Sequence, residues 1–147
     1  MTSFDFDSTL AKPELKDGIW ESRSNPNTDV ISLLKDLNKR GQRCIVVTSR
    51  SKNSMEEVVR FLKNNSVPVQ DLVFTDGEPK AKILSELGVE AHFDDSLIEA
   101  KACKKAGVKP VVVAHPMETE EVLESEFEAF FTSMVHKIHL KSIADQL

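Results

Sequence analysis

The stretch MTSFDFDSTL, residues 1–10, decides how the fold of this chain begins and where its chemistry lies. A short apolar run carries two carboxylates, Asp5 and Asp7, which lie two residues apart. Residues at that spacing in a strand point the same way, so both carboxylates can reach one small volume where the strand ends. Two like charges held that close are unfavourable unless a cation or a shared proton offsets them.

This spacing predicts a Mg²⁺ site in which one carboxylate is a nucleophile and the other an acid or base. A turn with two surface aspartates is the alternative, since a short motif alone is only a hypothesis.

Length and composition indicate one ordinary globular domain, because the chain has 147 residues, 40% hydrophobic and 29% charged. A net charge of −5 does not favour broad binding to nucleic acid or to anionic membranes. No apolar stretch is long enough to span a bilayer, and the N-terminus lacks the basic region of a signal peptide. Cys44 and Cys103 have no metal-ligand spacing and are expected to be reduced thiols. A cytoplasmic protein without membrane contact is therefore expected.

Strand-like runs alternate with helical patterns along most of the chain. Strands are expected over residues 3–6, 43–48, 72–75, 90–93 and 110–114, and helices over residues 28–40, 53–64, 79–87 and 96–106. The second and fifth runs are nearly continuous in β-branched residues, which is typical of strands buried on both faces. The alternation predicts an α/β fold with a mainly parallel five-stranded sheet and helices on both faces.

Two segments fall outside this alternation. Residues 11–27 contain Pro, Gly and Asn together with Trp20, the single tryptophan, and are predicted to form a loop beside the end of the first strand. Residues 116–147 show apolar side chains at helical spacing, which predicts a helix docked on the core or a homo-oligomer contact. We therefore expect one domain over residues 1–147, with a catalytic core over residues 1–115.

Polar residues follow three further predicted strands. Thr48-Ser49-Arg50 comes after the second strand, Lys80 begins the helix after the third, and Asp94-Asp95 comes after the fourth. Carboxylates for a metal, a hydroxyl and a lysine for phosphate oxygens, and an aspartate nucleophile together form a phosphoryl-transfer set. The hydroxyls and the acidic pair could instead cap helices, and His92 is expected to be structural.

Taken together, these four elements resemble the haloacid dehalogenase-like (HAD) hydrolases, mainly phosphatases that use an aspartate nucleophile and Mg²⁺. The resemblance covers roughly residues 1–114 and implies a Rossmann-like three-layer sandwich. It also implies that Asp5 takes the phosphoryl group. Asp7 would be the general acid and then the base, and its backbone carbonyl would ligate Mg²⁺.

The resemblance also implies roles at the later strand ends. Thr48 would hold a phosphoryl oxygen, with Ser49 as a weaker substitute, and Arg50 would touch the substrate. Lys80 would neutralise the phosphate, and Lys82 is its rival for that role. The acidic pair completes the set: Asp94 would bind Mg²⁺, with Asp95 as a direct or water-mediated partner.

The last expectations concern a cap domain and the class of substrate. Residues 11–27 are too short for a domain, so no large cap domain is expected. The DFDSTL start and Trp20 are weakly similar to compact phage and bacterial members, including polynucleotide phosphatase and RNA-repair-associated domains. A nucleotide or nucleic-acid phosphate end is therefore the expected substrate, with a phosphorylated small molecule as the wider class. Trp20 would stack on a base or pin its loop to the core.

Two other function classes stay open at the level of sequence. One is a non-catalytic binding or scaffold domain that keeps the fold. The other is a phospho-acceptor regulator, since response-regulator receivers also combine aspartates, a Thr or Ser and a Lys on a doubly wound sheet. Intact Asp5, Asp7, Thr48, Lys80 and Asp94 argue against the first, and the order of the motifs argues against the second.

Overall fold

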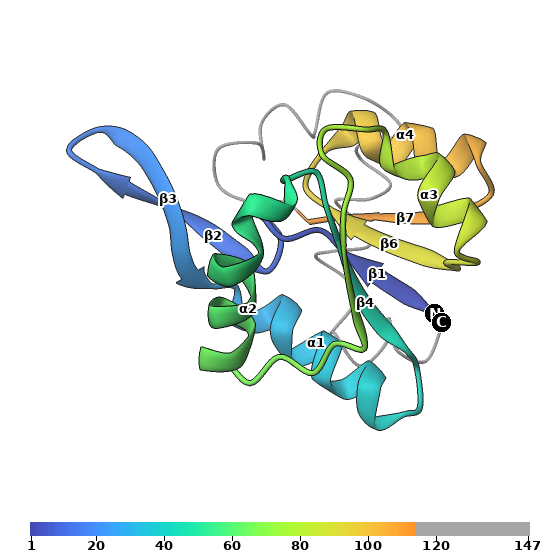
Figure 1. Cartoon of the computed structure of the whole chain (residues 1–147), viewed down its shortest axis with the longest axis horizontal. Helices are drawn as coiled ribbons and strands as arrows, with labels where there is room; N and C mark the ends of the chain where they lie inside the picture. Colours follow the sequence, from blue (N-terminus) through green and yellow to red (C-terminus); the bar gives the residue numbers. More distant parts are fainter. Residues whose placement is uncertain (114–147) are drawn as a thin grey trace.

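The computed structural model describes residues 1–113 of the chain (Figure 1). The segment over residues 116–147 lies outside the described residues. Its predicted helix, its contact between copies and the division into core and C-terminal segment therefore stay predictions.

Five parallel strands form the central sheet. They are β1 (Thr2–Phe4), β4 (Cys44–Thr48), β5 (Asp71–Phe74), β6 (Ala91–Asp94) and β7 (Lys109–Val112). Their order is β5-β4-β1-β6-β7, and all four pairings are parallel. The α/β prediction with a five-stranded parallel sheet is confirmed. The strand β1 is central, with β4 and β5 on one side of it and β6 and β7 on the other.

The four described α-helices cover both faces of this sheet (Figure 1). They are α1 (Thr28–Lys39), α2 (Met55–Asn64, which follows a 3₁₀ turn over Lys52–Ser54), α3 (Lys80–Glu86) and α4 (Leu97–Lys105). Alternate residues of β4 divide between the two layers. Cys44 and Val46 join the apolar cluster that contains α1 and α2, whereas Ile45 and Val47 pack with α3 and α4. Burial on both faces explains the continuous apolar run of β4.

A β-hairpin stands where the sequence predicts a loop, so that prediction is wrong. The strands β2 (Ala11–Lys16) and β3 (Ile19–Pro26) pair antiparallel and extend away from the main sheet (Figure 1). Asp17 and Gly18 join them, with φ angles of 51° and 76°. Positive φ at both central residues is the requirement of the tight hairpin turn that favours Asp-Gly.

The hairpin is the one insertion between β1 and α1, and the link between β5 and α3 is a short turn over residues 75–79. Within residues 1–113, the prediction of no large cap domain is confirmed. None of the described helices has the length and hydropathy needed to cross a membrane.

Packing of α1 against the sheet generates a stability prediction. Leu34 is fully buried in the larger apolar cluster, and truncating such a leucine leaves a cavity. The Leu34→Ala variant is expected to lower the free energy of unfolding by about 2–5 kcal/mol, measured by urea denaturation. Ile98 in α4 is 82% exposed, so Ile98→Ala should change that energy by less than about 0.5 kcal/mol. Equal effects of the two substitutions would contradict the packing described here.

Candidate active site

The carboxyl end of β1 lies where the strand order reverses, because β4 and β6 flank β1 on opposite sides. Ligand sites in open parallel sheets form at such points. Phe4 pairs with Val46 of β4 and with Phe93 of β6. The next residue, Asp5, therefore leaves the sheet beside the ends of both neighbouring strands. Its backbone N–H donates to the carbonyl of Phe93 at 2.8 Å, which holds it there.

Lys80 links two of the predicted carboxylates. It is the first residue of α3 and is only 2% exposed. Its Nζ donates to Asp5 Oδ1 at 2.8 Å and to Asp94 Oδ2 at 2.9 Å. The rival lysine, Lys82, has a side chain that is 84% exposed and lies 3.9 Å from Glu86. The structure thus brings Lys80, and not Lys82, to these carboxylates.

Burial and charge shift the pKa values of all three groups. Burial raises the pKa of Asp5 to about 6, and the charge of Asp94 adds to this rise while Lys80 opposes it. Burial alone would lower the pKa of Lys80, but Asp5 and Asp94 raise it above its ordinary value. Burial would also raise the pKa of Asp94, yet the hydrogen bond from His92 and the charge of Lys80 hold it well below its usual range.

A third carboxylate, Asp95, completes an acidic cluster. One oxygen from each of Asp5, Asp94 and Asp95 lies within 4.8 Å of the others. Burial, together with the charges of Asp5 and Asp94, raises the pKa of Asp95 to about 9. Lys80 offers a single positive charge against three carboxylates, so full ionisation leaves negative charge in excess. An oxygen-only donor set with excess negative charge suits a hard divalent cation such as Mg²⁺, and these residues therefore fit the predicted metal.

The side chain of Asp7 is paired with Arg50. Arg50 donates to it through Nε and Nη2, both at 2.8 Å, in a bidentate pair. The same guanidinium donates through Nη1 to Glu57 at 2.9 Å and lies 5.2 Å from the ring centre of Phe6. The predicted contact of Asp7 with Mg²⁺ is through its backbone carbonyl, and that contact stays a prediction.

The remaining predicted residues lie on β4, its following loop and the hairpin. Thr48 ends β4, is fully buried, and its Oγ1 accepts from the backbone N–H of Arg50 at 3.3 Å. Ser49 is exposed, and its backbone carbonyl accepts from Gly77 N–H at 2.8 Å. Trp20 lies on β3 in register with Leu15. Substrate contacts of Thr48, Ser49, Arg50 and Trp20 stay predictions.

His92 is the site neighbour whose contact the sequence analysis missed. Its Nε2 lies 2.9 Å from Asp94 Oδ2, and its Nδ1 lies 2.7 Å from Ser3 Oγ. His92 and Asp94 are two residues apart in β6, so their side chains point to the same side of the sheet. This spacing is the sequence signal that could have predicted the contact.

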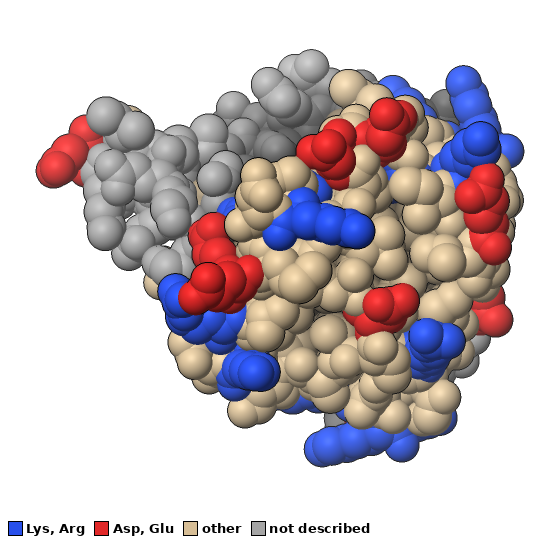
Figure 2. All heavy atoms as spheres, in the orientation of Figure 1, with Lys and Arg blue, Asp and Glu red and all other residues tan. Residues whose placement is uncertain are grey.

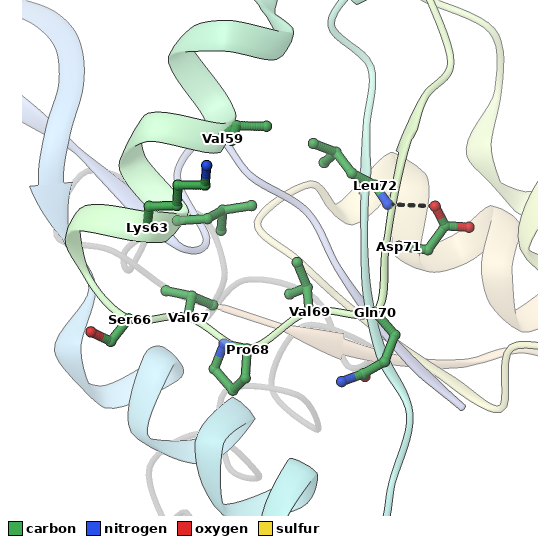
Figure 3. A pocket seen from close by; sticks show the side chains of 10 residues that line it. Val59, Lys63, Ser66, Val67, Pro68, Val69, Gln70, Asp71 and Leu72 are labelled. Carbon is green, nitrogen blue, oxygen red and sulfur yellow. Dashed lines mark hydrogen bonds between the residues drawn. The ribbon is translucent and has the colours of Figure 1, made fainter.

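A separate pocket of about 380 Å³ lies elsewhere on the molecule (Figure 3). Its lining includes Lys63 and Val67 near the end of α2 and Gln70 and Leu72 around the start of β5. It therefore opens at the amino end of β5, whereas Asp5, Lys80 and Asp94 gather at the carboxyl ends of β1 and β6. None of the carboxylates of the acidic cluster lines it.

Comparison with known proteins identifies the family. The family model of the 5′-nucleotidases matches residues 28–120, which is more than half of the chain. The chain belongs to the 5′-nucleotidase family. The matched residues include Thr48, Lys80 and Asp94 and begin after Asp5 and Asp7. The match agrees with the predicted resemblance to the HAD-like hydrolases. No curated protein sequence matches the chain.

Solved structures share the fold of this 5′-nucleotidase family member. Two structures of the Pnkp1/Rnl/Hen1 RNA repair complex match 76% of it, with TM-scores of 0.61 and 0.59 and identities of 21% and 22%. The match covers only 41% and 45% of those chains, so this chain spans less than half of their length. A D,D-heptose 1.7-bisphosphate phosphatase from B. bronchiseptica, complexed with magnesium and phosphate, matches 99% of this chain and 97% of its own, with a TM-score of 0.57 and 14% identity.

The burial of Asp95 and its repulsion by Asp5 and Asp94 generate a prediction for the metal-free protein. A pKa of about 9 for Asp95 in the folded chain, against an ordinary value of 3.8, means that the native state binds a proton that the unfolded chain releases. The free energy of unfolding of the wild type therefore decreases as the pH rises from 3.8 to about 9. The Asp95→Asn variant escapes this loss and should be more stable by about 0.5–2 kcal/mol in EDTA at neutral pH.

The gain from Asp95→Asn should be larger at pH 8 than at pH 5 in urea denaturation. Asp71 is exposed at the start of β5, and its Oδ1 accepts from Leu72 N–H at 2.8 Å. Asp71→Asn is therefore the matched control and should show no such gain. A gain for Asp95→Asn that is independent of pH would contradict the raised pKa of Asp95 that burial and repulsion produce.

Proposed function

We propose that this chain is a Mg²⁺-dependent phosphomonoesterase that forms an aspartyl-phosphate on Asp5. The observation that carries the proposal is the buried Lys80, whose ammonium donates to Asp5 and Asp94 inside the acidic cluster. Membership of the 5′-nucleotidase family supports the same reaction class. A carboxylate nucleophile beside a lysine and a metal-binding cluster is suited to phosphoryl transfer, in which positioning and charge stabilisation supply most of the catalysis.

In the proposed first step, an oxygen of Asp5 attacks phosphorus and the bond from phosphorus to the ester oxygen breaks. With a pKa of about 6, Asp5 is mainly ionised at pH 7 and is available as nucleophile. Asp7 gives its proton to the leaving oxygen. Lys80 offsets the charge of the phosphoryl oxygens as they approach Asp5. The hydroxyl of Thr48 is the proposed donor to one of these oxygens.

In the second step, water attacks the phosphorus of the aspartyl-phosphate and Asp7 takes the proton of that water. The bond from phosphorus to Asp5 breaks, inorganic phosphate leaves, and both aspartates return to their starting states. Both oxygens of Asp7 accept from Arg50 in the structure described here. Arg50 therefore orients the carboxylate that is proposed to exchange the proton.

Mg²⁺ is proposed to bind Asp5, Asp94 and the backbone carbonyl of Asp7, with Asp95 as a direct or water-mediated partner. When bound, it would supply positive charge to offset the repulsion between the phosphate and the Asp5 carboxylate. The oxygen-only cluster within 4.8 Å supports this assignment, and so does the excess of negative charge that Lys80 leaves.

The proposed substrate is a nucleotide or the phosphorylated end of a short nucleic acid. The 5′-nucleotidase family and the fold shared with RNA repair structures support this class. Among the residues that are coloured in Figure 2, Lys and Arg side chains are interspersed with Asp and Glu and form no continuous basic stripe. The net charge of −5 agrees with a small footprint, since long nucleic-acid contacts depend on many basic residues.

The nucleophile is tested with the Asp5→Asn variant. Because an amide cannot form the acyl-phosphate, phosphate release from p-nitrophenyl phosphate should fall by more than about 10³-fold. Circular dichroism should show the fold unchanged. The control variant is Asp71→Asn, at the amino end of β5, and it should keep the wild-type rate.

The metal requirement is tested by chelation. EDTA should stop phosphate release by the wild type, and added Mg²⁺ should restore it.

Full activity of Asp5→Asn would remove this mechanism. A folded wild type that releases no phosphate from any ester would favour a non-catalytic domain or a phospho-acceptor regulator instead.

The substrate class is tested by measuring kcat/KM for mononucleotides, phosphorylated oligonucleotides and sugar phosphates. The nucleotide esters should exceed the sugar phosphates by at least about tenfold, which corresponds to about 1.4 kcal/mol of additional transition-state binding. Equal values across the three groups would contradict recognition of the nucleoside.

A further inference from the structure

A buried chain of hydrogen bonds connects the central strand to the acidic cluster. Ser3 on β1 and His92 on β6 pair in register, and Ser3 Oγ lies 2.7 Å from His92 Nδ1. His92 Nε2 lies 2.9 Å from Asp94 Oδ2. All three residues are at least 97% buried. The imidazole therefore has no solvent partner, and both of its nitrogens are used between two protein groups.

The direction of these bonds follows from the chemistry of the partners. An ionised Asp94 can only accept, so His92 Nε2 carries a hydrogen and donates to Oδ2. In the neutral ring Nδ1 is then an acceptor, and the Ser3 hydroxyl donates to it. The other contact of that hydroxyl, to the carbonyl of Ala91, is much longer at 3.5 Å. A hydroxyl can donate or accept, so Ser3 holds Nδ1 in place while Asp94 sets the tautomer.

The two oxygens of Asp94 are used unequally. Oδ2 accepts from His92 and from Lys80 at 2.9 Å each, whereas Oδ1 accepts from the backbone N–H of Ser96 at 3.0 Å. A carboxylate oxygen has about two acceptor positions. Oδ2 therefore has both of its positions filled by these two donors, whereas the Ser96 N–H fills only one of the two positions of Oδ1.

We propose that His92, anchored by Ser3, is a positioning residue that turns Asp94 so that Oδ1 is its metal-binding oxygen. This inference rests on the proposed Mg²⁺-dependent function. The terminal torsion of an aspartate is broad and roughly two-fold, and Lys80 alone could follow either oxygen. The bond from the rigidly held imidazole removes that freedom. Such partners of metal ligands typically contribute 10–100-fold to metal affinity or activity.

Two matched variants of His92 separate this role from simple packing. The amide nitrogen of glutamine reaches about as far as Nε2, so His92→Gln keeps a donor for Asp94. The shorter asparagine reaches only about as far as Nδ1, so His92→Asn keeps a group near Ser3 and loses the donor to Asp94. The measurement is Mg²⁺ affinity of the full chain by isothermal titration calorimetry, with circular dichroism and thermal melting in EDTA as folding controls.

The expected result is a Kd for Mg²⁺ that rises about 10–100-fold in His92→Asn and less than about threefold in His92→Gln. The KM for p-nitrophenyl phosphate at saturating Mg²⁺ should change little in either variant. Wild-type affinity in folded His92→Asn would overturn the inference. An equal loss in both variants would also overturn it, because the donor to Asp94 would then not be the cause.

Ser3→Ala keeps the test decisive if His92→Asn does not fold. It leaves the imidazole in place but removes the anchor of Nδ1, and it should weaken Mg²⁺ binding while its melting temperature in EDTA stays near that of the wild type. Unchanged Mg²⁺ affinity in Ser3→Ala would overturn the inference. A wild type that binds Mg²⁺ as described but releases no phosphate would count against the proposed function alone.

Discussion

The pairing of the buried Lys80 ammonium with Asp5 and Asp94 is the interaction on which the rest of the site depends. A charge that is removed from water is costly unless it is paired and hydrogen-bonded. Lys80 meets this condition through Asp5 and Asp94, at 2.8 and 2.9 Å. Lys80 begins α3, Asp5 directly follows β1 and Asp94 ends β6. The same contacts that neutralise the charge therefore also hold the helix against the ends of two neighbouring strands.

Apolar layers make this concentration of charge possible. Two clusters on opposite faces of the sheet hold the strands in register. The carboxyl ends of the strands carry three carboxylates, and burial together with their mutual repulsion raises the pKa of Asp5 and Asp95. Local repulsion of this kind is expected at functional sites, where residues are selected for chemistry rather than for stability. His92, held by Ser3, extends this network through Asp94, whereas Asp7 is held by Arg50.

Much of the fold could be predicted, because buried parallel strands and amphipathic helices leave distinct patterns. The five strands and four helices lie within a few residues of their predicted positions. The hairpin was missed because its strands lack a clear alternation, although Asp17-Gly18 between them is a strong turn signal. The contact of His92 was missed for another reason. Its two partners lie on different strands, and Ser3 is distant in the chain.

The sequence by itself determined which residue types follow each strand, and hence the class of chemistry, because strand and helix periodicities are local properties of the chain. Which side chains meet was decided only by the tertiary structure. The start of α3 buries Lys80 and leaves Lys82 in solvent. The strand order places β6 rather than β5 beside β1, and so places Asp94 beside Asp5. Hydrogen bonds and charge pairing act over a few ångströms, and the distances between residues far apart in the chain exist only once the sheet has formed.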